Sequence, residues 1–295
     1  MNSPYFAPRQ FSRLLTAILP FLFLMLACSP PVKRPTGPAA EYEDAKEMFK
    51  RGRFDRTLEF TDDLATATPG NAFTERACVL RAVIYAGYIK AHKELVDAYD
   101  KALEKTKNPR FQAEYGRQRH DNMQFGARAA LGLGEVANRL TEGGKISKEL
   151  VLEASYPSME GPVEVAQLER MKAGSWIEPE DQEAAMVDAQ RKGIDDALGE
   201  AVGGDRAKAR EVLATGSFKI NGVDFAVFLG KQLLEGASLY DKKHGRDSQK
   251  FKLLCNVASQ AAQAAVADLK ENPNPDKEKE VKKLQDTIKT ALKKG

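Results

Sequence analysis

The chain has 295 residues, of which 29% are charged and 42% hydrophobic, and its formal net charge is +3. Acidic and basic residues are interleaved, so the one-sided basic excess of a nucleic-acid-binding protein is missing and we expect no nucleic-acid partner. Alanine, leucine, lysine and glutamate are frequent whereas strand-forming residues are sparse. This composition predicts an all-α protein.

The first feature along the chain is an apolar run over residues 14–27, which follows two arginines. It is shorter than the ~20 residues that a membrane-spanning helix needs, and it is typical of a cleaved export signal. Met-Leu-Ala-Cys at residues 25–28 resembles the lipobox of bacterial lipoproteins. The resemblance implies that residues 1–27 form a lipoprotein signal peptide and that the thiol of Cys28 carries lipid, palmitate included. An ordinary secretory signal or an uncleaved anchor is the alternative.

Cleavage before Cys28 would remove Arg9 and Arg13 and no acid, which lowers the formal charge to +1. Residues 28–38 are rich in proline and predict an extended tether that rises ~3 Å per residue and holds the folded part ~30 Å from the bilayer. Serine after Cys28 is similar to the sorting signal of enterobacterial lipoproteins of the outer membrane. We therefore expect a lipid-anchored protein of the cell envelope, in the outer membrane and facing the periplasm.

Residues 41–71 resemble a tetratricopeptide repeat. Ala45 occupies the small position where the two helices of such a repeat touch, Gly52 breaks the first helix and Phe54 covers the turn. Other matching positions are Met48, Leu58, Pro69 and Asn71. A single hairpin cannot bury its apolar faces alone and must stack on neighbours. The resemblance implies stacked antiparallel helical hairpins, a TPR-like α-solenoid, over residues 39–158.

Two long helical segments follow. Apolar residues recur at helical spacing over residues 72–107, which predicts one long helix or two helices joined near Gly87. Asn108-Pro109 ends this segment, because the residue before proline resists helical geometry. A further helix is expected over residues 110–140, with small residues on one face that admit a close neighbour: Gly126, Ala130 and Gly134. The tyrosines of the first segment, Tyr85, Tyr88 and Tyr99, pack between helices or line a groove.

A turn-rich segment over residues 155–162 marks a boundary before a C-terminal helical region, residues 159–295. Helices are expected over residues 163–172, from Pro179 to about Gly203, and from a cap at Asp205 to about Ala214. Trp176 lies between two of these helices. It is either a hydrophobic lid over the boundary or a ligand-stacking residue.

Residues 218–225 alternate around Asn221-Gly222, which is typical of a β-hairpin. Two isolated strands of about four residues would be marginal, and helical spacing continues after Gly222, so we favour a helix from Gly222 onward. Residues 247–270 form a clean helical stripe that should pair with that helix. A last, lysine-rich helix from Asp276 is expected to cap the stack.

Cysteine and histidine residues are few. Cys78 and Cys255 lie in apolar helical runs and are expected to be reduced and buried rather than paired. The histidines are scattered singly, so no metal site is predicted. Glycine motifs after Gly132 and Gly143 imitate nucleotide-binding sequences but lack a preceding strand or the upstream glycine. No catalytic motif is present, and we expect neither enzymatic activity nor a cofactor.

Two functions fit these features. Helical repeats usually bind a protein or peptide on a concave face, which favours a membrane-anchored binding scaffold. The alternative is a carrier of an apolar small ligand, because residues 69–95, with Pro69, Asn71, Tyr85 and Tyr88, resemble the lipoproteins associated with TRAP-type transporters. That resemblance implies helical hairpins around an apolar passage. An envelope enzyme is the least favoured reading.

Overall fold

The computed structural model describes residues 36–158, 166–240 and 248–294. The chain divides into two units between Ala40 and Glu41, and residues 36–40 are the described part of the first unit. The second unit, residues 41–295, is called the body below. The expected signal peptide, Cys28 and most of the tether lie outside the described residues.

The described residues are mostly helical, as predicted. The α-helices and 3₁₀ helices, in chain order, are α2 (Pro38–Lys50), α3 (Phe54–Thr66), α4 (Thr74–Lys105), α5 (Pro109–Leu140), η1 (Glu142–Gly144), α6 (Ala166–Lys172), α7 (Pro179–Ala201), α8 (Arg206–Leu213), α9 (Gly222–Ala237), η2 (Ser238–Tyr240), α10 (Ser248–Glu271) and α11 (Pro275–Lys294). Two short strands, β1 (Glu149–Leu152) and β2 (Phe218–Asn221), complete the described elements.

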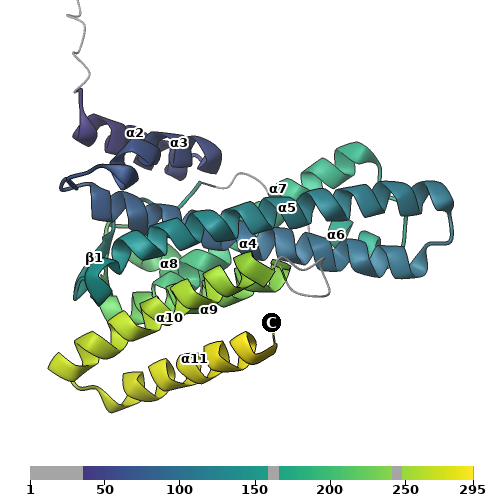
Figure 1. Ribbon diagram of the computed structural model, residues 1–295. Coiled ribbons are helices and arrows are strands. Elements are labelled where there is room, and N and C mark those ends of the chain that lie inside the picture. Colours follow the sequence, from purple (N-terminus) through teal and green to yellow (C-terminus); the bar gives the residue numbers. More distant parts are fainter. Residues whose placement is uncertain (1–35, 159–165, 241–247, 295) are drawn as a thin grey trace, which may run out of the picture. The chain divides into compact units, whose positions relative to one another are not determined.

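Helices α4 and α5 form a long antiparallel hairpin in the middle of the body (Figure 1). Each helix has 32 residues. The Asn108-Pro109 pair separates the two helices, as expected. The Asn108 side chain accepts a hydrogen bond from the backbone N–H of Arg110, and Pro109 takes the first position of α5. The segment 72–107 is thus a single helix, and Gly87 does not interrupt it.

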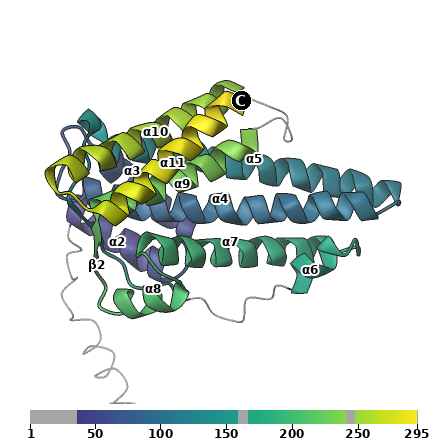
Figure 2. The same ribbon diagram turned by 90° about the horizontal axis from the view of Figure 1, so that it is seen from below.

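Gly87 instead marks the point where α4 crosses α7. The backbones approach so closely there that a Cβ atom on Gly193 of α7 would overlap the carbonyl oxygen of Gly87. Figure 2 shows α7 along one side of α4, with α9, α10 and α11 on the other side. Helix α4 therefore belongs to both the N-terminal and the C-terminal regions, and the boundary expected in residues 155–162 stays a prediction.

Each helix from α3 to α11 in the main stack packs on its successor: α3 on α4, α4 on α5, α5 on α9, α9 on α10 and α10 on α11. The small face expected on α5 is confirmed, since Ala130 packs against Gly236 of α9 and Gly134 lies near Leu254 of α10. The expected pairing of α9 with α10 is also confirmed. Helices α6, α7 and α8 lie between α5 and α9 in sequence and pack beside this stack.

Residues 218–225 contain a strand followed by the start of a helix, so the hairpin expectation and the helix expectation are each met in part. The helix begins at Gly222 as favoured, and the Asn221 side chain caps it by accepting hydrogen bonds from the backbone N–H groups of Val223 and Asp224. Residues 218–221 are nevertheless a strand, which pairs antiparallel with β1 and not within a hairpin. The sequence did not predict β1, because its partner lies far away along the chain.

The repeat-like segment forms two helices of 13 residues each, α2 and α3. Gly52, with φ of 70°, ends α2, and the Arg53 N–H reaches back to the carbonyl of Met48 in a Schellman-type turn. Phe49 and Phe54 cover this turn with ring centroids 5.5 Å apart. Helices α4 and α5, with 32 residues each, are longer than this pair, and the TPR-like solenoid expected over residues 39–158 stays a prediction.

Candidate functional site

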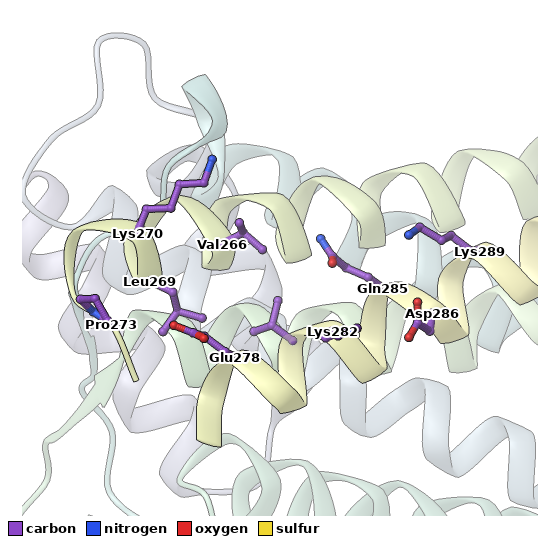
Figure 3. Close-up of a pocket in the computed structure, with 10 residues that line it drawn as sticks. Val266, Leu269, Lys270, Pro273, Glu278, Lys282, Gln285, Asp286 and Lys289 are labelled. Atoms are coloured by element: carbon purple, nitrogen blue, oxygen red, sulfur yellow. The ribbon is translucent and has the colours of Figure 1, made fainter. Parts of the chain in front are cut away.

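A groove runs between α10 and α11 at the C-terminal side of the body (Figure 3). Its volume is about 440 Å³. The apolar lining, called the floor below, comes from Val266 and Leu269 of α10, from Val281 of α11 and from Pro273. Figure 3 shows Pro273 at one end. Lys270, Glu278, Lys282, Gln285, Asp286 and Lys289 line the remainder. We call this feature the α10–α11 groove.

Helix α11 packs on both α9 and α10. Leu284 reaches Gly230 of α9 so closely that a Cβ atom on this glycine would lie 2.6 Å from a Leu284 methyl group. Two ion pairs hold the same side, Lys231–Glu280 at 2.7 Å and Lys277–Asp224 at 2.6 Å. Apolar residues at helical spacing bury this face of α11, as the sequence predicts: Val281, Leu284 and Ile288. The α10–α11 groove lies along the contact of α11 with α10.

The lining of the groove combines apolar surface with charged side chains. Val266 is half-buried, so apolar surface remains available on the floor. Three lysines and two carboxylates alternate along the rim and offer both donors and acceptors. Such a surface can hold a partly apolar ligand and fix its register through the rim charges.

The tyrosines of α4 pack between helices and do not line the groove. The Tyr85 ring lies over Gly132 of α5, and its hydroxyl accepts a hydrogen bond of 3.0 Å from Arg81. The Tyr88 hydroxyl donates to Asp55 of α3 at 2.6 Å. Tyr99 is buried near Gln182 of α7. Of the two readings of these tyrosines, the structure places all three in packing roles.

Trp176 stacks on Phe111 and Tyr115 of α5, with ring centroids 4.3 Å and 5.6 Å away. Its indole N–H donates to the Glu178 carboxylate at 2.9 Å. The Tyr115 hydroxyl in turn donates to the Ser175 carbonyl and accepts from the Ile177 N–H. Trp176 thus packs on α5 near the connection between α4 and α5, in contact with two aromatic rings.

Cys78 and Cys255 are free and fully buried, as predicted. Burial raises the pKa of each thiol to about 11, so neither is an activated nucleophile. His92 is also buried and its pKa is lowered by burial. Its Nδ1 lies 2.9 Å from the Asn122 side-chain oxygen, which makes Nδ1 the protonated nitrogen since Asn122 uses its amide group to donate to Gln118.

The sequence did not single out the groove residues. Val266 and Leu269 lie within the helix expected over residues 247–270, but no local pattern marks them as part of a groove. Cys28, the one residue predicted as a site, lies outside the described residues.

The described part of the chain contains no group of three or more His, Cys, Asp or Glu side chains that could hold a metal ion. Within the same residues, no helix has both the length and the apolar character needed to cross a bilayer. Comparison of the chain with family models, curated proteins and solved structures gives no match. The geometry of the α10–α11 groove is therefore the main basis for a functional proposal.

Proposed function

We propose that the chain is a lipid-anchored protein of the cell envelope that binds a protein or peptide partner in the α10–α11 groove and catalyses no reaction. The observation that carries this proposal is the open groove with an apolar floor and a rim of alternating charges. In this proposal the succession of packed helices from α3 to α10 is a short, TPR-like stack, and α11 is its capping helix. The stacking contacts between successive helices support it.

A peptide suits the groove better than a fully apolar small molecule. A carrier of an apolar ligand would enclose it and exclude water, whereas this groove is open along its length and rimmed by five charged side chains. An amphipathic helix could place a few apolar side chains on Val266 and Pro273 and pair its polar groups with the rim. The carrier remains the second candidate, because the floor itself is apolar.

Lipid anchoring is tested at Cys28. Replacing Cys28 with alanine removes the thiol to which the lipid would be attached, so we expect an unprocessed precursor or a chain released from the membrane fraction. Fractionation of cells and intact-protein mass spectrometry measure this. Cys78→Ala is the matched control and should leave both processing and fractionation unchanged. Normal mass and normal membrane partitioning of the Cys28→Ala variant would contradict the anchoring proposal.

Partner binding is tested with a photo-crosslinking amino acid at Gln285, which lines the groove. We expect a protein adduct in cells, and we expect Val266→Glu to reduce it at least tenfold, because a carboxylate on the apolar floor must be desolvated. The matched control is a crosslinker at Gln263, which is exposed on α10 and does not line the groove. Gln263→Glu adds the same charge and should leave the adduct at Gln285 intact.

The same material separates the candidate functions. Native mass spectrometry of the purified chain that finds a retained apolar molecule, with no protein adduct at Gln285, would favour the carrier. Equal adducts at Gln285 and Gln263 would show that the groove does not select the partner. Substrate turnover by the purified chain, abolished by one polar substitution, would overturn both binding proposals.

A further inference from the structure

One edge of α11 carries a row of alternating charges along the α10–α11 groove. Glu278, Lys282, Asp286 and Lys289 follow one another at steps of four, four and three residues, so they share one face of the helix. Figure 3 shows them in succession along the groove. Their signs are negative, positive, negative and positive from the start of α11 toward its end. We call this set the α11 charge row.

The charges of this row are available to a partner. All four side chains are exposed, and none of them forms an ion pair with another described residue. Pairing is absent even between Glu278 and Lys282 and between Lys282 and Asp286, which have the four-residue spacing that permits it on a helix. The ion pairs that join α11 to α9 use two other side chains, Lys277 and Glu280.

The α11 charge row is complementary to itself when two copies of α11 run antiparallel. Glu278 then lies opposite Lys289 of the second copy, and Lys282 lies opposite its Asp286. A two-fold axis repeats both contacts. Both pairs have their midpoint at or beside Leu284, within one residue of the middle of α11, so the two helices overlap along almost their full length. A parallel pair in the same register would place like charges against each other.

The apolar part of the groove suits the same arrangement. Val266 is half-buried and Pro273 is exposed. The aliphatic stem of a lysine can lie on such a surface while its ammonium group reaches a carboxylate. Lys289 of the second copy would do so beside Glu278, toward the end of the groove where Figure 3 shows Pro273. Gln285 lines the groove next to the axis, where its amide group can exchange hydrogen bonds with the same residue of the second copy.

We propose that the α10–α11 groove binds a second copy of this chain through antiparallel α11 helices, which rests on the binding function proposed for the groove and names the partner. Exposed ion pairs contribute little one by one, so the α11 charge row mainly sets the orientation and the register of the two helices. The contact uses the same surface on both copies, and it therefore closes at two copies and leaves no free binding face.

Thiol crosslinking of the full chain in cells tests this arrangement. Gln285→Cys places a thiol next to the two-fold axis, and a short bis-maleimide should join two copies into a covalent dimer. Thr287→Cys is the matched control, because Thr287 is exposed on α11 but does not line the groove. We expect about tenfold less dimer from it, since only thiols that the interface holds together react at high effective concentration. No dimer from Gln285→Cys, or equal yields from both variants, would overturn the proposal.

Charge exchange in the Gln285→Cys chain tests the pairing itself. Lys282→Glu would face Asp286 of the second copy, and Asp286→Lys would face its Lys282. Each single variant replaces attraction with repulsion twice and should lower the dimer yield about tenfold. The double variant Lys282→Glu/Asp286→Lys restores opposite charges and should recover the dimer. Co-expression of the two single variants with different tags should also recover a mixed dimer, which repulsion within one helix does not explain.

A photo-crosslinking amino acid at Gln285 distinguishes a second copy from another partner. An adduct with twice the mass of the chain supports both the second copy and the binding function of the groove. An adduct with a different protein, without the dimer, would overturn the second copy as the partner but leave the groove as a binding site. The absence of any adduct would overturn both. A dimer yield that Lys282→Glu and Asp286→Lys leave unchanged would overturn the antiparallel arrangement.

Discussion

Replacing Gly193 with alanine is expected to destabilise the body by about 3 kcal/mol, because the new Cβ atom would overlap a backbone atom and not a movable side chain. The overlapping atom is the carbonyl oxygen of Gly87, and the Ala91 backbone nitrogen would lie 3.1 Å away. Relief requires that α7 move away from α4, which opens the packing of both helices. Urea unfolding of the purified chain, followed by circular dichroism, measures the change.

The control for this substitution is Gly116→Ala in α5. No atom lies within 4 Å of the position of a Cβ atom on Gly116, and the residue has ordinary helical backbone geometry. Alanine should therefore stabilise the chain by about 0.5–1 kcal/mol, as expected for glycine in a helix interior. If Gly193→Ala and Gly116→Ala had the same effect on the free energy of unfolding, the close crossing of α4 and α7 would be wrong.

The thiols of Cys78 and Cys255 should react with iodoacetamide about two orders of magnitude more slowly in the folded chain than in urea at pH 8. The pKa of each is raised to about 11 by burial, so about 0.1% of either thiol is ionised at that pH, against roughly a quarter for an unfolded cysteine. Mass spectrometry of the labelled chain measures both rates. Because only the thiolate reacts, the slow rate should rise about tenfold per pH unit below the pKa.

Cys78→Ser and Cys255→Ser assign the slow rate to each thiol in turn. Cys78 also lies at the wall of a surface hollow that Arg139 lines. Local opening of the structure should therefore expose the Cys78 thiol more readily than the Cys255 thiol. Labelling of either cysteine in the folded chain at the rate found in urea would contradict its burial. A mass lower by two hydrogens in the unreduced chain would show a disulfide and overturn the assignment of two free thiols.

The long helices were predictable because their signals are local. Apolar periodicity and the Asn108-Pro109 pair set the ends of α4 and α5 to within a few residues. The start of α9 at Gly222 and the presence of the last helix, α11, were also predicted correctly. Each of these signals acts over a few residues, where chain geometry and burial are coupled directly.

The features that were not predicted depend on residues far apart in the sequence. In the sequence, Gly87 indicates a place where two helices could be joined. Its role in the close crossing of α4 and α7 depends on Gly193, which lies on another helix. The strand at residues 149–152 is recognisable only beside β2. The α10–α11 groove depends on how α11 packs against α9 and α10. No local pattern encodes these distances.

The β1–β2 pair has a consequence for the order in which the chain folds. Two strands of four residues are marginal alone, and joining residues 149–152 to 218–221 closes a long loop of chain at an entropic cost. This entropic cost is smaller once the helices have packed, because β1 contacts α4 and β2 contacts α9. We therefore expect the helices to assemble first and the small sheet to form late. The sheet would then join both ends of the segment that contains α6, α7 and α8 to a helical stack that has already formed.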